Sequence, residues 1–460
     1  MDQRIRYYVV LQASPKLLRA HAAGDRAEVE QHISSSLTGG PETESSRVSG
    51  LPSRRRAIPK LPHGAEVIDV VIAGRPPRYA VVALGFEHPQ EVRRFDRLIK
   101  ERAWKETVVG GADLQFSGSE HWCTGEASDP IFGDRKEAER LIGVPFIRDK
   151  KKLRGKGVNV VIVDQGIDSG VLGSSYGGGW PVKSTPPGKT SAPFGSMRRP
   201  HGMMIAHNVL QVAPEATLWD LPMVPQRIID VEGYFLYTAD AAFRTMLDGI
   251  AQYRKSGKYP GPWVLVNAWA IFTRNDEHPP KSYTDNPTHP FNLMVAEAVD
   301  SGIDVIFCAG NCGGFCPDTR CGGRDQGAGN SIFGANCHPK VVSVGAVRSD
   351  TIWLGYSSQG PGQPGFGPLA HDKPDLCAPS QFCENHDAFS INDGTSAATG
   401  LTAGVIAALR SNPKWDSTKV PPEKLKSVLN STARRPAGSA WNNRTGNGIL
   451  DAEAAYNALP

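Results

Sequence analysis

Four polar residues of the sequence lie where apolar segments begin or end, and together they could do chemistry. Asp164 ends the β-branched run in VNVVIVDQGI (158–167), and Asn311 follows a similar run in FCAGNCGG. His201 opens a helix-like segment, and Ser396 lies near the start of a small-residue helix in NDGTSAATG. Taken singly, each has an ordinary explanation: a turn carboxylate, a packed histidine, a turn asparagine or a helix cap.

Taken together, these residue types supply the parts of an acyl-transfer site. A hydroxyl at a helix N-terminus has free N–H groups and a favourable dipole beside it for developing negative charge. A histidine can take the proton of that hydroxyl, and a buried carboxylate can hold the histidine in the required tautomer. A side-chain amide can donate to an oxyanion. All four roles are filled.

The segments that position these residues alternate between strand and helix patterns. Buried-strand patterns recur at 158–167, 263–272, 303–311 and 340–347, and helical patterns lie at 236–257 and 291–300. This alternation predicts an α/β domain with a mostly parallel sheet covered on both faces. The site of such a sheet lies at the carboxyl ends of its strands, where the four polar residues fall.

The first quarter of the chain has a different pattern. Strands are predicted at 6–12, 66–74, 78–86 and 107–116, and helices at 14–37 and 88–106. The order β-α-β-β-α-β predicts a small ferredoxin-like α+β domain over 1–118. A connector over 119–139 then leads into the larger domain, which we expect over 140–460.

Composition excludes several classes of protein. Of the 460 residues, 40% are hydrophobic and 21% charged, which is ordinary for a chain with a buried core, and the net charge is only +4. This balance argues against a nucleic-acid partner. No apolar run is long enough to span a membrane, so we expect no membrane partner either. The N-terminus lacks a signal-peptide pattern, so we expect a cytoplasmic protein, with export by a non-standard route left open.

The motifs DQGI, HGMMIA, CAGN and GTSAA, in this order, resemble those of the subtilisin-like serine proteases, the subtilases. The order Asp, His, Ser is the one known for subtilisin. VAPEATLWDLPMV (212–224), VVSVGAV (341–347) and GNGILDAEAAYNAL (446–459) are also similar to segments of that family. The resemblance runs from about residue 140 to the end and implies a subtilisin-like three-layer domain.

The resemblance implies a serine endopeptidase with protein or peptide substrates. Ser396 would be the nucleophile, His201 the general base, and Asp164 the residue that orients His201. Asn311 would join the oxyanion hole. Two alternatives remain: a catalytically silent subtilase fold used for binding, and a hydrolase of esters or other amides.

The segment VNAWAIF (266–272) departs from the family's substrate-pairing strand, which usually reads Ser-Leu-Gly. We expect Trp269, Ala270 and Gly310 to contact substrate, and the side-chain preference stays open. In the family, the position of residues 1–118 implies a propeptide that acts as an intramolecular inhibitor. A permanent regulatory domain and a partner-binding module are the alternatives.

Five cysteines crowd one segment of the chain: Cys308, Cys312, Cys316, Cys321 and Cys337. Their spacing does not match that of a typical zinc site, and Cys308 is expected to be a core residue. For these cysteines, loop-stapling disulfides, free thiols and a metal site are the three alternatives. For the predicted catalytic site, we expect no metal ligand and no required cofactor. Many subtilases bind calcium, but no contiguous acidic loop here indicates such a site.

Overall fold

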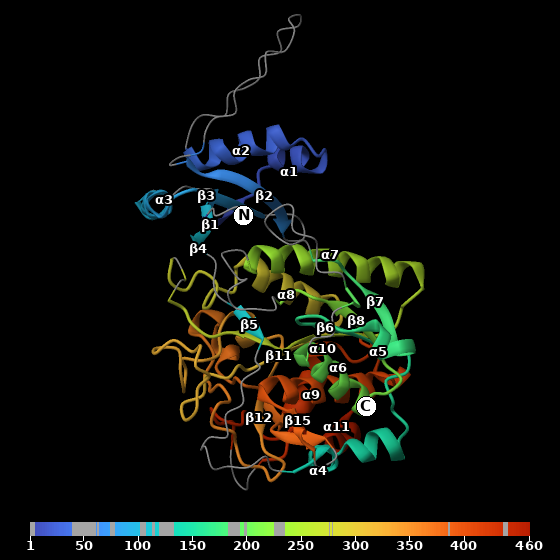
Figure 1. Ribbon diagram of the computed structural model, residues 1–460. Helices are drawn as coiled ribbons and strands as arrows, with labels where there is room; N and C mark the ends of the chain where they lie inside the picture. The colour runs from blue at the N-terminus through green and yellow to red at the C-terminus, as the bar shows by residue number, and fades with distance from the viewer. Residues whose placement is uncertain are drawn as a thin grey trace, which may run out of the picture.

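The computed structural model describes most of the chain, and Figure 1 shows its ribbon. The described residues are 5–38, 61, 64–73, 79–101, 107–112, 116–118, 133–182, 194–196, 200–224, 235–275, 277, 279–384, 387–435 and 440–460. Residues 119–132 of the predicted connector lie outside this set.

A parallel sheet is the centre of the large domain. Within the described residues it has seven strands, in the order β13-β12-β11-β9-β6-β8-β7. The strands are β6 (Asn159–Val163), β7 (Tyr176–Gly179), β8 (Thr217–Leu221), β9 (Trp263–Asn267), β11 (Ile303–Cys308), β12 (Val342–Val347) and β13 (Leu376–Pro379). Every residue of β6, β9 and β11 is buried, as expected for strands covered on both faces.

Helices cover both faces of this sheet and make three layers (Figure 1). Helices α6 (Pro200–Val212) and α9 (Gly394–Arg410) pack on one face, where their apolar side chains share a cluster with α4 (Arg135–Leu141), α10 (Pro422–Thr432) and α11 (Ala452–Ala458). Helices α7 (Phe235–Ser256) and α8 (Pro290–Asp300) pack on the other face. A four-residue helix, α5 (Ser169–Leu172), follows β6. The predicted three-layer fold is therefore confirmed.

The N-terminal domain is a four-stranded antiparallel sheet in the order β2-β3-β1-β4, with helices beside it. Its elements are β1 (Ile5–Gln12), α1 (Pro15–Ala22), α2 (Arg26–Thr38), β2 (Glu66–Ala73), β3 (Tyr79–Phe86), α3 (Pro89–Glu101) and β4 (Thr107–Ala112). The predicted single helix over 14–37 is divided, because Gly24 adopts a φ of +69° between α1 and α2.

Alternating side chains of the N-terminal sheet face two different cores. Tyr7, Val9 and Leu11 point toward the domain's own helices. Tyr8 and Val10 share a cluster with apolar residues of α7 and α8. This strand alternation places the N-terminal sheet on the outer side of the α7–α8 layer (Figure 1).

Two short strand pairs complete the described structure. β14 (Phe382–Glu384) and β15 (Asp387–Asn392) form a hairpin that ends just before α9. β5 (Phe116–Gly118) pairs antiparallel with β10 (Trp269–Ile271), which follows β9 after Ala268. The predicted strand over 107–116 corresponds to β4 and the first residue of β5, and residues 113–115 lie outside the described residues. No helix in the described parts of the chain is long and apolar enough to cross a membrane.

Candidate active site

Asp164 and His201 form a buried pair at the carboxyl end of β6. The exposed fraction is 0% for Asp164 and 3% for His201. His201 Nδ1 lies 2.8 Å and 3.0 Å from the two carboxylate oxygens. Because an ionised carboxylate can only accept, Nδ1 carries the proton in this pair. That tautomer leaves Nε2 able to accept a proton from a nucleophile.

His201 lies in the first turn of α6, and this turn can approach the end of β6 closely because the next residue, Gly202, has no side chain. A Cβ atom at Gly202 would lie 2.3 Å from the carbonyl oxygen of Gly166, so no larger residue fits there without a shift. The Asp164 carboxylate is also held by its neighbour, since Oδ1 accepts the Gln165 N–H at 2.8 Å. These contacts fix the pair at the start of α6.

Ser396 lies fully buried in the first turn of α9. Its hydroxyl donates to the carbonyl oxygen of Ala268 at 3.1 Å, at the junction between β9 and β10. The Asp393 side chain caps the helix by accepting the Gly394 N–H. A nucleophile at this position has first-turn N–H groups and the helix dipole beside it.

A polar cluster ties the hairpin before Ser396 to the helix that carries His201. Arg135 of α4 donates from Nε to both oxygens of Glu384 at 2.9 Å and 2.7 Å. Its Nη2 donates to the oxygen of Asn208, on α6, at 2.6 Å. Asn392 donates to Glu384 at 2.7 Å. The hairpin β14–β15 and α6 are therefore held by one arginine.

Asn311 lies beside the start of α9 with its amide held in one orientation. Its Oδ1 accepts the Thr395 hydroxyl at 2.8 Å and the Thr395 N–H at 3.1 Å. The Thr395 Oγ1 in turn accepts the Gly310 N–H at 3.3 Å. Because the oxygen of Asn311 is occupied, its Nδ2–H groups are the ones directed elsewhere, as an oxyanion donor requires.

The three residues expected to contact substrate have different positions. The Trp269 indole is buried in the core, with its ring 5.3 Å from Phe307, and only the backbone of Trp269 pairs with β5. Ala270 faces Gly310, because a Cβ atom at Gly310 would lie 3.3 Å from that of Ala270. The structure therefore brings Ala270 and Gly310 together and turns the Trp269 side chain away.

Sequence reasoning missed two residues beside the expected site. Thr395 stands in the GTSAA motif, and its contact with Asn311 across 84 positions has no local signal. Asp393 was not singled out either. Burial raises the pKa of its carboxyl group to about 7, and His201, Tyr356 and Asp318 are close enough to influence it.

The cysteines separate into disulfides and buried thiols. Cys312 and Cys321 form a disulfide, Cys316 is disulfide-bonded as well, and Cys308 and Cys337 are free and buried. The Cys321 Sγ lies 3.6 Å from the carbonyl oxygen of Asn311. Of the three alternatives, disulfides are thus formed in the loop after Asn311. In the described part of the chain, no group of three or more His, Cys, Asp or Glu side chains could hold a metal ion.

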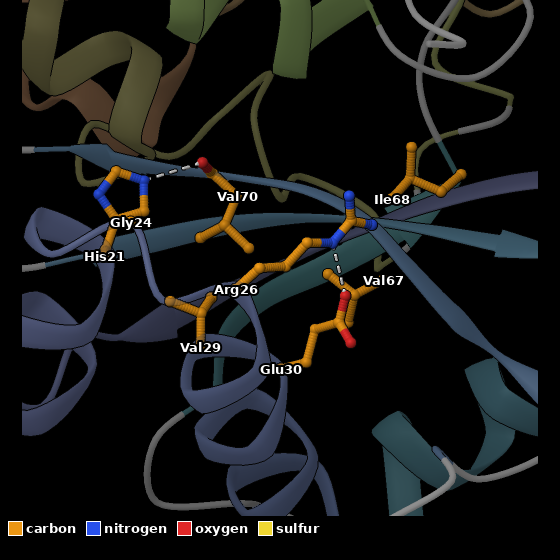
Figure 2. Close-up of a pocket in the computed structure, with 8 residues that line it drawn as sticks. All are labelled: His21, Gly24, Arg26, Val29, Glu30, Val67, Ile68 and Val70. Atoms are coloured by element: carbon orange, nitrogen blue, oxygen red, sulfur yellow. Dashed lines mark hydrogen bonds and ion pairs between the residues drawn. The ribbon is translucent and has the colours of Figure 1, made fainter. Parts of the chain in front are cut away.

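A separate pocket of about 220 Å³ lies in the N-terminal domain, between the α1–α2 turn and β2 (Figure 2). His21 Nε2 donates to the Val70 carbonyl at 3.2 Å, and Arg26 donates to Glu30 at 2.8 Å. None of the four candidate catalytic residues lines it. We therefore do not assign the chemistry to this pocket.

Known proteins share the family pattern and the fold of this chain. The family model of the subtilase peptidases matches residues 155–448. No curated protein matches the chain in sequence. A crystal structure of fervidolysin from Fervidobacterium pennivorans, a keratinolytic enzyme related to subtilisin, superposes with a TM-score of 0.55 at 16% identity. The alignment covers 100% of this chain, which spans only 62% of that chain's length.

Two further solved structures share less of the geometry. A lanthipeptide protease has a TM-score of 0.47 at 18% identity, over 71% of this chain and 95% of its own. MycP1 from Mycobacterium smegmatis has a TM-score of 0.46 at 18% identity, over 75% of this chain and 91% of its own. At 16% identity, the fervidolysin structure shows a shared fold and no more. The family match covers well over half of the sequence, and the chain belongs to the subtilase family.

Proposed function

We propose that the protein is a serine endopeptidase that cleaves proteins or peptides through an acyl-enzyme on Ser396. The observation that carries the proposal is the buried Asp164–His201 pair, with His201 Nδ1 at 2.8 Å from the carboxylate. Membership of the subtilase family supports the same assignment. The proposed chemistry uses side chains and main-chain amides, so it requires no cofactor.

In the proposed reaction, the Ser396 hydroxyl exchanges its hydrogen bond with Ala268 for one with His201 Nε2. His201 takes the proton as the oxygen attacks the peptide carbonyl, and Asp164 stabilises the imidazolium that forms. The Asn311 amide and the Ser396 N–H donate to the oxyanion. His201 then protonates the leaving amine, and water releases the acyl group by the same steps.

The proposal is tested by labelling with a serine-directed fluorophosphonate. Wild type should be labelled once, at Ser396, and Ser396→Ala should not be labelled although it keeps the same melting temperature. Labelling is followed for a day after folding, because a docked N-terminal segment delays entry of the reagent. A folded wild type without label contradicts the enzyme proposal and favours a binding protein.

We also propose that the N-terminal domain is an intramolecular inhibitor. Two features support this role. Its sheet packs on α7 through Tyr8 and Val10, and the following strand β5 pairs with β10 beside Ser396. A segment paired with β10 occupies the strand edge that a substrate would use.

Intact-mass analysis of freshly folded protein tests this second proposal. Wild type should lose a fragment through a cut near 115–150, and Ser396→Ala should stay at full mass. An active enzyme that keeps its full length would contradict the inhibitor role and favour a permanent regulatory domain.

A further inference from the structure

We propose that Arg135 is a positioning residue of the peptidase, which fixes the distance between the helix that carries His201 and the hairpin that leads into Ser396. Its guanidinium donates to a side chain on each of these two elements. The inference rests on the proposed peptidase function and adds a residue on which the turnover depends.

Asn208 is the point on α6 that Arg135 holds. It follows His201 by seven positions, which is about two helical turns, so the two side chains lie on the same side of the helix. Asn208 is 0% exposed and faces α9, because a Cβ atom at Gly400 would lie 2.9 Å from the Asn208 Cβ. Gly400 comes about one helical turn after Ser396. Asn208 therefore lies where the helices of the proposed base and nucleophile meet.

Glu384 and Asn392 are the points on the hairpin β14–β15 that Arg135 holds. Its Nε donates to both oxygens of Glu384, at 2.9 Å and 2.7 Å. Asn392 is 2% exposed and donates to Glu384 at 2.7 Å, which links the two strands of the hairpin. Asn392 is the last residue of β15 and precedes α9 and Ser396 closely. A shift of the hairpin is therefore carried to the start of α9.

A single nitrogen of Arg135 joins the two sides. Nη2 donates to Asn208 Oδ1 at 2.6 Å and to Asn392 Oδ1 at 3.4 Å. The guanidinium is planar and rigid, so the bonds made on one side fix the direction of those on the other. Its Cζ also lies 5.3 Å from the ring centre of Phe382. The guanidinium is therefore held in one place between α6 and the hairpin.

The ion pair between Arg135 and Glu384 stays formed over the pH range of the proposed reaction. Burial raises the pKa of Glu384, but hydrogen bonds from His207 and Arg135 outweigh burial and hold this pKa well below its usual range. A glutamate ordinarily titrates near about pH 4.3, so Glu384 is ionised from about pH 5 upward. The link between the two elements therefore does not depend on pH in this range.

The main chain beside Arg135 is held without the guanidinium. Asp134 caps α4 by accepting the Glu137 N–H at 2.9 Å, and it forms a parallel bridge with Cys383 of the hairpin. The Cys383 N–H donates to the Gly133 carbonyl at 3.2 Å. Because these bonds do not involve the Arg135 side chain, a substitution there should leave α4 in its place. Such a substitution therefore tests the guanidinium itself.

The role predicted for Arg135 concerns turnover and not substrate binding. Within the described residues, the side chains that accept hydrogen bonds from Arg135 lie on α6 and on the hairpin, whereas we expect a substrate strand at β10. Loss of the guanidinium should therefore disturb the alignment of Ser396 with His201 more than the binding of a peptide. A misplacement of about 1 Å in a reacting group can cost about 10²-fold in rate.

Steady-state kinetics on one quenched peptide that wild type cleaves test this role. Arg135→Lys keeps the charge, but a single ammonium cannot reproduce the fork that bonds Glu384 and Asn208 together. We expect kcat to fall about tenfold, with KM within about twofold of wild type. An unchanged kcat in folded Arg135→Lys protein would overturn the inference, and so would a change confined to KM.

Asn208→Leu separates positioning from stability, because it removes the α6 bond and keeps Arg135 with Glu384. Within the described residues, Asn208 Nδ2 is buried without a hydrogen-bond partner, so an apolar side chain of similar shape should leave the melting temperature nearly unchanged. We expect kcat to fall about three- to tenfold nonetheless. An unchanged kcat in this variant would overturn the link through α6.

The double variant Arg135→Lys with Asn208→Leu tests whether the two residues act through one link. It should be no slower than Arg135→Lys alone, because both substitutions break the same connection and their effects are then not additive. A kcat loss equal to the product of the two single losses would show independent effects and overturn the shared role.

Arg410 offers a matched control, because it is another buried arginine that donates to both oxygens of a carboxylate. Its Nε and Nη2 each lie 2.6 Å from an oxygen of Asp304, at the end of α9 away from Ser396. Arg410→Lys should lower the melting temperature with kcat unchanged. An equal loss of kcat in Arg410→Lys and Arg135→Lys would overturn the specific role of Arg135.

Fluorophosphonate labelling of the same proteins separates failure of this inference from failure of the peptidase proposal. If wild type is labelled and Arg135→Lys turns over at the wild-type rate, the positioning role alone is overturned. If folded wild type takes no label, the peptidase proposal fails, and this inference fails with it.

Discussion

Thr395 donates both printed hydrogen bonds to the Asn311 oxygen, and this contact decides which end of the amide can face an oxyanion. An asparagine amide that can flip would present oxygen to an oxyanion in part of the molecules. The threonine hydroxyl removes that freedom without touching the reacting atoms. Thr395 is therefore a positioning residue of the proposed site.

Thr395→Val should lower kcat by about three- to tenfold with KM nearly unchanged, because one of the two bonds to Asn311 is lost. Thr395→Ser should restore most of the loss, since it keeps the hydroxyl. Asn311→Ala should cost about 10²–10³-fold in kcat, the range found when an oxyanion donor is removed from subtilisin itself. Steady-state kinetics on one peptide decides; a change confined to KM would contradict the positioning role.

Asp393 should influence the pH profile of the reaction. Burial raises the pKa of its carboxyl group to about 7. Histidine ordinarily titrates near pH 6.5, so activity should rise through about pH 6–7 as His201 loses its proton. Above pH 7 the ionised Asp393 carboxylate stabilises the protonated imidazole of His201. The rise in activity is therefore shifted to higher pH.

Asp393→Asn removes this charge and keeps a helix-capping side chain. The acidic limb of kcat/KM should therefore move to lower pH in Asp393→Asn, as measured from pH 5 to 9. An unchanged limb would show that Asp393 does not act on His201. A wild-type profile that is flat over this range would count against His201 as the base.

The four candidate residues could be predicted because each stands at the end of an apolar run or the start of a helix pattern, and because their motifs occur in the order known for the subtilases. A buried β-branched run ends at Asp164, and a small-residue helix begins near Ser396. Thr395 acts through hydrogen bonds to a residue 84 positions away, and no local pattern encodes such a distance. That the four residues catalyse a reaction stays a prediction.

At the scale of elements, the loop after Asn311 is closed by the disulfide between Cys312 and Cys321, which are nine positions apart. The loop also contacts Asn311 directly, since Asp318 N–H donates to the Asn311 carbonyl at 2.9 Å. Constraint on this loop therefore also constrains the proposed oxyanion donor.

Replacing both cysteines, Cys312→Ser with Cys321→Ser, should lower the free energy of unfolding by about 2–3 kcal/mol, from loop-closure entropy. It should also lower kcat more than it raises KM, because Asn311 loses support. Denaturant unfolding and peptide kinetics measure the two effects. A variant as stable as wild type would contradict the constraint.

The cytoplasmic location stays a prediction, and a structural disulfide argues for an oxidising compartment.

The class of each element could be predicted more readily than its ends. Apolar runs indicated β6, β9, β11 and β12 of the large sheet and strand patterns indicated all four strands of the N-terminal sheet, but β7, β8 and β13 were not among the predicted runs. Two boundaries were missed for backbone reasons: Gly24 ends α1 with a positive φ, and the run 263–272 is divided at Ala268 into β9 and β10. The pairing of β5 with β10 is a contact between segments that are far apart in the sequence, so sequence pattern alone could not predict it.

At the scale of the whole molecule, His289 links the N-terminal domain to the large domain. It caps α8 by accepting the Phe291 N–H at 3.2 Å, is 0% exposed, and packs against Tyr8 with ring centres 6.1 Å apart. Burial lowers its pKa to about 3. In the unfolded chain the same imidazole takes a proton near pH 6.5.

Stability should therefore fall as pH drops from about 6.5 toward 3, because the unfolded state binds a proton that the folded state excludes. One such group contributes at most about 1.4 kcal/mol per pH unit. His289→Asn keeps a capping side chain and does not titrate, so its melting temperature should fall less steeply in acid. His371→Asn, at an exposed histidine, should follow wild type; identical slopes in all three would contradict the assignment.

Strand β5 is connected by covalent bonds to one sheet and paired by hydrogen bonds with β10 of the other domain. A tethered segment meets its site at an effective concentration fixed by the tether, not by how much protein is dissolved. If Ser396 makes the first cut within its own molecule, the reaction is first order, and a hundredfold dilution should leave the half-time of fragment appearance unchanged. The delay between folding and release of the fragment would then be a property of each single molecule, whatever the protein concentration.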